Sequence, residues 1–319
     1  MQFNLRMCPA KSAPLYPLQV DGEAAWQVLP SGRHILEIPL PSVPADHIIV
    51  PSLCVVGAQP HFQFSLQQDE ESIALHPVPN AKSFKPHKYT KPCATPHIDC
   101  WHSQAQLNAA RITLEVQLDS SLTDLHHLVT VSIRPLEMPV PSSPPAMRTS
   151  LEIPAHYSQM QAAQKIRQRI CSPTALAMAL SISSPAPSWP DTVDACFDPF
   201  TNAYGAWPLA IQWAGRNGRL AAVETFTNWD KAQQCLQAGA PLVCSIRWDK
   251  DNLDHAPMAS SGGHLVLLQG LDPEQAVALA LDPAAADVAT VPRHYKLNQF
   301  AGAWLGRRGA AYIIGQAVG

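Results

Sequence analysis

A cysteine stands where an irregular stretch ends and a helical pattern begins, in Ile170-Cys171-Ser172-Pro173-Thr174. Apolar residues recur at helical spacing over residues 172–183, and proline is tolerated in a first helical turn because its missing N–H would lack a partner anyway. The unpaired N–H groups and the positive dipole end of a helix favour the thiolate, which is the nucleophilic form of cysteine. Cys171 is therefore a candidate nucleophile, although a buried, unreactive cysteine is the commoner outcome for this local pattern alone.

A histidine that could act as the base stands at the mouth of an apolar strand. Gly262 and Gly263 precede His264, and the apolar run Leu265-Val266-Leu267-Leu268 follows it. The two glycines leave free space before the ring, which suits a base that must face a cleft. Taken alone, a histidine at a strand end is more often a structural residue whose ring nitrogens are hydrogen-bonded within the fold.

An aspartate is expected to meet this histidine across a hairpin. The segment Leu271-Asp272-Pro273-Glu274-Gln275 is a turn signal, so the strands on either side of it are expected to pair. In that register His264 lies opposite Asp282 or Pro283. Directly opposed side chains are about 5 Å apart, so the Asp282 carboxylate can orient the imidazole and stabilise the imidazolium. Asp272 has the same Leu-Asp-Pro context but would lie at the far end of the hairpin, and it is predicted to be a turn residue.

A glutamine upstream of the cysteine could stabilise the oxyanion of a tetrahedral intermediate, because its amide donates a hydrogen bond without titrating. Four glutamines precede the candidate nucleophile: Gln159, Gln161, Gln164 and Gln168. Spacing alone does not choose among them.

The elements that must position these side chains belong to the second half of the chain, which is predicted to be α+β because helices come first and an antiparallel sheet follows. The expected helices are 172–183, Trp207–Ala214 and Trp229–Ala238, and the expected strands are Leu242–Trp248, His264–Leu271, Ala276–Leu281 and Ala310–Ile314.

The first 140 residues contain no convincing helix. Apolar residues alternate with polar ones over Arg111–Leu118, and Val129, Val131 and Ile133 repeat the pattern, which predicts strands with one face buried and one face wet. Weaker strand candidates are His34–Leu40, His47–Val56, His61–Leu66 and Ser72–Val78. Short strands separated by turn residues favour an antiparallel sandwich or an open barrel.

A proline-rich stretch, residues 135–150, separates the two halves with prolines at 135, 139, 141, 144 and 145. We expect it to form neither a helix nor a strand ladder and to act as a semi-rigid linker. The predicted organisation is a β-rich, sandwich-like domain over residues 1–140, a linker over 141–150 and an α+β domain over 151–319.

Several separated motifs in the second half occur in one order. They are IPAHYSQM (153–160), RICSPTALAMAL (169–180), YGAWPLAIQWAG (204–215), AGAPLVCSIRW (238–248), SGGHLVLLQG (261–270), LALDPAA (279–285) and HYKLNQFAGAW (294–304). Together they resemble the cysteine peptidases related to the bacteriocin-processing, double-glycine-leader peptidases, which are relatives of papain.

The resemblance implies a papain-like domain that hydrolyses peptide bonds of a peptide or protein substrate without a cofactor. It assigns Cys171 as nucleophile, His264 as base, Asp282 as orienting acid and Gln159, in the Ser-Gln-Met motif, as oxyanion donor. Ser172 stands where the transporter-linked members carry glycine, and no transporter or ATP-binding segment is present. These departures argue against cleavage of a double-glycine leader but not against papain-like chemistry.

Two other functions fit the same residues. A shared scaffold does not fix the substrate, so the chain could be an amidase, an isopeptidase or an acyltransferase. It could also be a binding module with a silent site.

The composition argues against some classes of binding partner. Of the 319 residues 46% are apolar and 15% are charged, and the formal net charge is −3, so we expect no partner recognised mainly by charge, such as nucleic acid or an anionic membrane. Charged residues and prolines interrupt the N-terminus, and no run approaches the roughly 18–20 apolar residues that cross a bilayer. The expectation is a cytoplasmic protein without membrane insertion; oligomeric state is not indicated.

One cluster of soft ligands is present. Cys93, His97, Cys100 and His102 follow the spacing C-x3-H-x2-C-x-H, which fits no common structural zinc site. We therefore expect no metal there. The eight cysteines include no CxxC pair, and most are expected to be reduced and buried.

Overall fold

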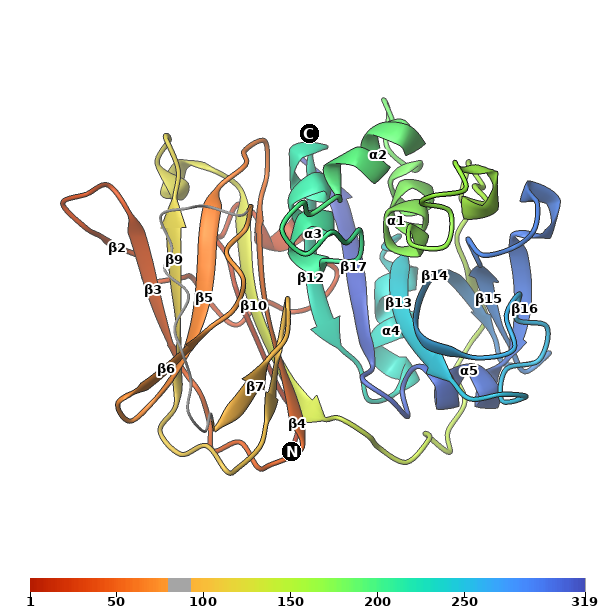
Figure 1. The fold of residues 1–319 in the computed structure, drawn as a ribbon, viewed down its shortest axis with the longest axis horizontal. Helices are drawn as coiled ribbons and strands as arrows, with labels where there is room; N and C mark the ends of the chain where they lie inside the picture. The colour runs from red at the N-terminus through yellow and green to blue at the C-terminus, as the bar shows by residue number, and fades with distance from the viewer. Residues whose placement is uncertain (80–92, 319) are drawn as a thin grey trace.

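The structure, a computed structural model, describes residues 1–79 and 93–318 (Figure 1). Within these residues every α-helix lies after position 170, as the lack of helical periodicity in the first half predicts. The first half instead contains two short 3-10 turns, η1 (Ala13–Leu15) and η2 (Leu122–Asp124), and ten strands.

The strands of the first half form two antiparallel sheets of five strands each. One sheet has the order β1 (Phe3–Met7), β10 (His127–Pro135), β4 (His47–Val55), β8 (Trp101–Ser103) and β7 (Ala94–Pro96). The other has the order β2 (Gln27–Val28), β3 (His34–Pro39), β9 (Arg111–Gln117), β5 (His61–Gln68) and β6 (Glu71–Ala74). Buried side chains from both sheets, such as Phe64 and Leu114 from one and Val131 from the other, form a single apolar cluster.

The second half contains a seven-stranded sheet with helices packed against it. The order is β12 (Arg219–Thr225), β17 (Ala310–Ala317), β13 (Leu242–Trp248), β14 (Ser261–Asp272), β15 (Val277–Leu281) and β16 (Pro292–Lys296), with β11 (Thr149–Ser150) also paired to β14. The helices are α1 (Cys171–Leu180), α2 (Trp189–Ala195), α3 (Trp207–Arg216), α4 (Trp229–Gln237) and α5 (Leu297–Ala303). This mixture agrees with the α+β prediction.

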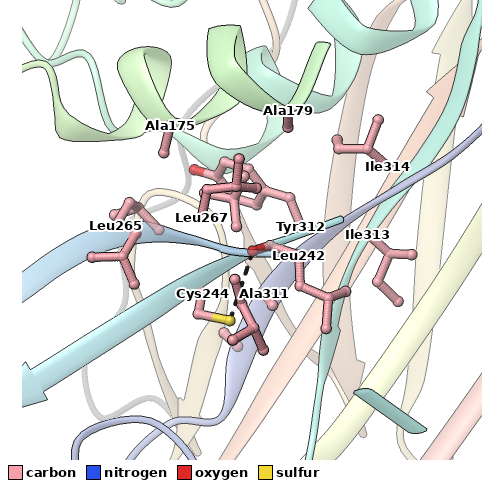
Figure 2. Close-up of a cluster of buried hydrophobic side chains, with 14 of the residues drawn as sticks. Ala175, Ala179, Leu242, Cys244, Leu265, Leu267, Ala311, Tyr312, Ile313 and Ile314 are labelled. Carbon is pink, nitrogen blue, oxygen red and sulfur yellow. Dashed lines mark hydrogen bonds between the residues drawn. The ribbon is translucent and has the colours of Figure 1, made fainter. Parts of the chain in front are cut away.

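Helix α1 is held close to the sheet by small side chains. Ala175 and Ala179, one helical turn apart, face the strands, as Figure 2 shows, and both are fully buried. Every residue of α1 after Cys171 is buried. The N-terminus of the helix therefore has a fixed position over the sheet.

Strand β10 differs from the prediction of one wet face. All of its residues from His127 to Arg134 are buried, including Thr130 and Ser132, because the face that carries them packs against the second half. The Thr130 hydroxyl donates to the carbonyl of Val223 in β12 at 3.3 Å. The sheet that contains β4 and β10 is thus a wall shared by the two halves.

The contact between the halves is close. At Gly215 in α3, an added Cβ would lie 2.5 Å from the carbonyl oxygen of Val55 in β4, so only glycine fits. The Gly215 carbonyl also accepts a hydrogen bond from the N–H of Gly57 at 3.0 Å.

The proline-rich stretch is less isolated than predicted. Pro135 still belongs to β10, and at the other end Thr149 and Ser150 pair with Leu271 and Gly270 of β14. The expectation that the stretch forms no ladder is wrong at both ends. Proline lacks the ladder donor, but Thr149 and Ser150 have free N–H groups and can pair.

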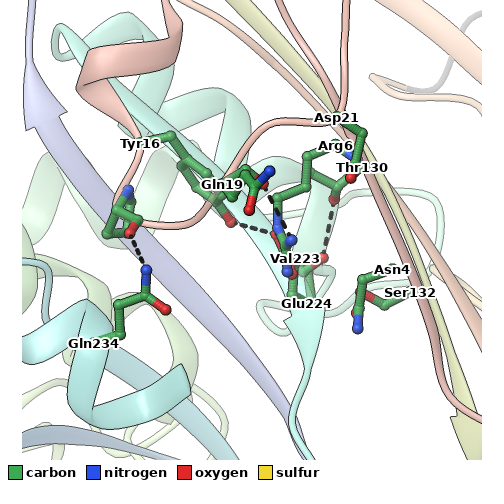
Figure 3. A network of polar contacts seen from close by, with 11 residues as sticks. Asn4, Arg6, Tyr16, Gln19, Asp21, Thr130, Ser132, Val223, Glu224 and Gln234 are labelled. Atoms are coloured by element: carbon green, nitrogen blue, oxygen red, sulfur yellow. Dashed lines mark hydrogen bonds and ion pairs between the residues drawn. The ribbon is translucent and has the colours of Figure 1, made fainter. Parts of the chain in front are cut away.

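A buried ion pair joins the N-terminal strand to the second half (Figure 3). Arg6 of β1 donates through Nε and Nη2 to the two carboxylate oxygens of Glu224 in β12, at 2.7 and 2.5 Å, and the Tyr16 hydroxyl donates to Glu224 Oε1 at 2.7 Å. The side chains of Arg6 and Glu224 are 8% and 1% exposed. This bidentate geometry satisfies both partners away from water.

In the part of the chain that the structure describes, no helix has the length and apolar character needed to span a bilayer.

The substitution Glu224→Ala should lower the free energy of unfolding by about 3–5 kcal/mol, because it leaves the Arg6 guanidinium buried without its counter-ion. Urea unfolding followed by tryptophan fluorescence measures this loss. The matched control is Glu37→Ala, which removes the partner of Arg111 in a pair whose side chains are half exposed. The control should lose no more than about 1 kcal/mol; equal losses in the two variants would contradict the prediction.

Candidate active site

Cys171 lies at the start of α1 and is partly exposed as a residue, whereas the rest of the helix is buried. The residue before it, Ile170, provides no side-chain cap, so the first N–H groups of the helix are left for other acceptors. A hydrogen bond of 2.7 Å between the hydroxyls of Ser172 and Tyr312 ties this first turn to β17. The start of the helix, and with it Cys171, is thus held in a fixed position against the sheet.

Cys171 differs electrostatically from the other cysteines. Burial would raise the pKa of its thiol, but the hydrogen bond and charge of His264, together with the backbone N–H groups of Leu265 and Ser172, bring that pKa below its ordinary value. Burial raises the pKa of each of the other seven cysteines. Cys171 is the one sulfur whose surroundings favour the thiolate.

The His264 ring lies between the sulfur and a carboxylate. Its Nε2 is 2.7 Å from Oδ1 of Asp282, which leaves Nδ1 to contact Cys171. Burial would lower the pKa of His264, but Asp282 and Cys171 raise it to about 10. The Trp248 ring packs edge-on against the imidazole with centroids 6.0 Å apart. The His264 side chain is 3% exposed, so the charge of its imidazole depends on Asp282 and Cys171.

Asp282 reaches the histidine by a different register from the one predicted. The hairpin forms, with Leu267 opposite Leu281, but a bulge between Leu268 and Gly270 shifts the pairing and β15 ends at Leu281. Asp282 is therefore the first residue beyond the ladder rather than a partner within it. Asp272, as predicted, serves the turn, where its Oδ1 accepts from the N–H of Gln275 at 3.0 Å.

Tyr295 is a member of this site that the sequence analysis missed. Its hydroxyl donates to Oδ2 of Asp282 at 2.6 Å, and the N–H of Ala284 donates to Oδ1 at 2.9 Å. Burial would raise the pKa of Asp282, but His264, Tyr295 and Ala284 bring it below its ordinary value. Tyr295 is the buried residue of the strand Pro292–Lys296. The hydroxyl of a buried tyrosine usually requires a hydrogen-bond partner. The burial of Tyr295 follows only from the tertiary fold, so the sequence carried no local signal for this contact.

Gln159 is tied by hydrogen bonds to the segment that follows Asp282 and to the segment that precedes Cys171. Its backbone N–H donates to the carbonyl of Pro283, next to Asp282, and its side-chain Nε2 donates to the carbonyl of Arg167, at 2.8 and 2.7 Å. Gln159 is 4% exposed, whereas the other three candidates, Gln161, Gln164 and Gln168, are exposed. The second hydrogen on Nε2 stays available for another acceptor.

The soft-ligand cluster does not come together as a metal site. The rings of His97 and His102 lie against one another at a tilt, with Nε2 of the first 3.1 Å from Nδ1 of the second, while Cys100 is buried beside Asp99. In residues 1–79 and 93–318, no three His, Cys, Asp or Glu side chains are placed to hold a metal ion.

Comparison with known proteins gives a family for the second half. The sequence model of the Peptidase C39 like family matches residues 151–312, slightly more than half of the chain. No curated protein is similar enough to match. Among solved structures, the crystal structure of a double glycine motif protease from an AMS/PCAT transporter in complex with the leader peptide aligns with 14% identity, covering 53% of this chain and 95% of that one, at a TM-score of 0.34.

The substitution Tyr295→Phe should move the pH midpoint of Cys171 alkylation upward by about 0.5–1 unit. Loss of the hydroxyl raises the pKa of Asp282, so the carboxylate stabilises the imidazolium less and the imidazolium stabilises the thiolate less. Iodoacetamide labelling across pH, read by mass spectrometry, measures the midpoint. Tyr157→Phe, which removes a hydroxyl from a ring stacked on Trp189, is the control; an unmoved midpoint in Tyr295→Phe would overturn the assignment.

Proposed function

The chain belongs to the Peptidase C39 like family, and from this premise we propose that it is a cysteine peptidase with Cys171 as nucleophile, His264 as base and Asp282 as orienting acid. The observation that supports the proposal is the continuous contact from sulfur to imidazole to carboxylate, with the pKa of Cys171 lowered and that of His264 raised. Such opposite shifts favour a thiolate–imidazolium pair at neutral pH.

The reaction begins with attack on a peptide carbonyl. The Cys171 thiolate forms a C–S bond, and the negative charge moves to the carbonyl oxygen. The free Nε2 hydrogen of Gln159 and the backbone N–H of Cys171 are the proposed donors to this oxyanion. His264 then gives its proton to the leaving nitrogen, the C–N bond breaks and an acyl-enzyme remains.

Water completes the cycle. Neutral His264 removes a proton from water, the hydroxide attacks the thioester and the sulfur leaves as thiolate, which restores the ion pair. Asp282 stays ionised throughout, because Tyr295 and Ala284 hold its oxygens. No step requires a metal or an organic cofactor.

We also propose the division of the chain. Residues 151–319 form the papain-like peptidase domain, residues 141–150 are the linker and residues 1–140 are a β-rich, sandwich-like accessory domain. The shared apolar cluster of its two sheets supports the sandwich. The double sheet touches the peptidase half through β4 and β10.

Alkylation tests whether the site is reactive. Iodoacetamide at pH 6.5 should modify Cys171 at least about tenfold faster than an ordinary thiol, because an unperturbed cysteine is then almost wholly protonated. His264→Ala should remove this advantage, and His61→Ala, an exposed histidine on β5, should keep it. Reaction of Cys171 no faster than that of an ordinary thiol would point to a silent binding module. Fast labelling without hydrolysis of a proteome-derived peptide library would favour an amidase, isopeptidase or acyltransferase.

Hydrolysis of a peptide taken from that library should have a bell-shaped pH profile. Activity rises with pH as Cys171 ionises, below the ordinary thiol value, and falls as His264 loses its proton at a pH of about 10. In Asp282→Asn the alkaline limb should move to lower pH, because the carboxylate no longer raises the pKa of His264, and the acid limb should move up. Limbs that keep their positions in this variant would contradict the assigned roles.

A further inference from the structure

Three arginines gather in a groove between the two halves. Arg247, at the end of β13, and Arg307 and Arg308, after α5, line it. Two neighbouring cavities of about 570 and about 430 Å³ share Arg247, Arg307 and Glu137 as lining residues.

The groove holds three carboxylates as well as three guanidinium groups, because Asp46, Glu137 and Asp249 also line its two cavities, but among the described residues only Arg307 forms ion pairs with them. Arg307 pairs with Glu137 and with Asp249, each at 2.9 Å. Arg308 has no carboxylate within ion-pair distance in the described part of the chain, and Arg247 donates its Nε to a carbonyl, that of Gly262, at 2.9 Å. Burial is the main cause that lowers the pKa of Arg247; the charges of Arg308 and Arg307 lower it further, and Glu137 and Asp249 oppose the shift.

Neighbouring histidines do not add to this charge. Burial, His97 and Arg308 lower the pKa of His102, which lines the smaller cavity, to about 4. The imidazole is therefore neutral at physiological pH. Arg247 and Arg308 form no ion pair within the described part of the chain, so their guanidinium groups are the ones that could receive an added carboxylate.

The groove adjoins the candidate site formed by Cys171, His264 and Asp282, on the side of His264. Gly262, which Arg247 contacts, is two residues before His264, and Trp248 both lines the larger cavity and packs on the His264 ring. Trp248 is 3% exposed, and its indole N–H has no hydrogen-bond partner among the described residues. A buried donor without a partner is costly unless a ligand supplies an acceptor.

We propose that this groove binds a carboxylate on the leaving fragment of the substrate, with Arg247 and Arg308 as its receptors. The inference rests on the proposed peptidase function, in which His264 protonates the leaving nitrogen and the fragment that starts there lies on the His264 side. Arginine favours carboxylates because its planar group donates two parallel hydrogen bonds. The carboxylate belongs to an acidic side chain or to a free C-terminus.

Chloroacetyl peptides test this without knowledge of the natural substrate. The Cys171 thiolate displaces chloride from the CH₂ carbon, so a C–S bond forms as the C–Cl bond breaks, and the peptide extends toward the His264 side. Three probes distinguish the sources of the carboxylate: chloroacetyl-Ala-Glu-amide, chloroacetyl-Ala-Gln with a free C-terminus, and neutral chloroacetyl-Ala-Gln-amide. At least one acidic probe should label Cys171 about tenfold faster than the neutral probe, and added salt should reduce the ratio.

Variants assign the preference to the groove. The acidic-to-neutral ratio should fall toward one in Arg308→Gln and in Arg247→Gln, and Arg247→Lys should restore part of it. Arg308 makes no side-chain hydrogen bond in residues 1–79 and 93–318, so its replacement should leave the fold intact. Arg111→Gln, at a half-exposed arginine of β9, should keep the wild-type ratio.

The outcomes separate the two proposals. Equal rates for acidic and neutral probes, or a preference that survives in both glutamine variants, overturns the groove assignment and leaves the peptidase proposal standing. Labelling by the neutral probe that does not depend on His264 overturns the peptidase proposal and this inference with it.

Discussion

The hydrogen bond between His264 and Asp282 is the constraint on which the candidate site depends. Both groups are almost completely buried, and burial alone would drive each to its neutral form. Their charges persist because each lies against the other at 2.7 Å and because Tyr295 and Ala284 donate to the remaining lone pairs of the carboxylate. The ionisation of Cys171 follows from this pair, since the imidazolium is its main source of stabilisation.

The positions of Cys171 and Asp282 are set by the elements that pack around the His264–Asp282 hydrogen bond. Small residues on α1 bring the cysteine close to the sheet, and the end of β15 delivers Asp282 to the same point. The first half contributes no residue to the sulfur–imidazole–carboxylate row, yet it buries the far edge of the second half through β4, β10 and the Arg6–Glu224 pair. The groove that holds Arg247 and Arg308 lies where the two halves meet.

Periodicity predicted much of this architecture. The alternation in Arg111–Leu118 and the run after His264 correspond to β9 and β14, and the hairpin about Asp272 forms. The exact register of this hairpin could not be predicted, because the pattern of apolar residues does not reveal the bulge between Leu268 and Gly270. The same is true of Tyr295 and of the Arg6–Glu224 pair, whose partners are 218 residues apart, since no local pattern encodes a contact made only by the tertiary fold.

The wall formed by β4 and β10 has a consequence for biosynthesis. Its outer face carries Ile48, Val50 and Cys54, which belong to the same apolar cluster as α3 and β12. During translation these residues leave the ribosome long before the segments that cover them. The first half of the nascent chain therefore exposes an apolar surface. The second half covers this apolar face only once it has been synthesised and has folded.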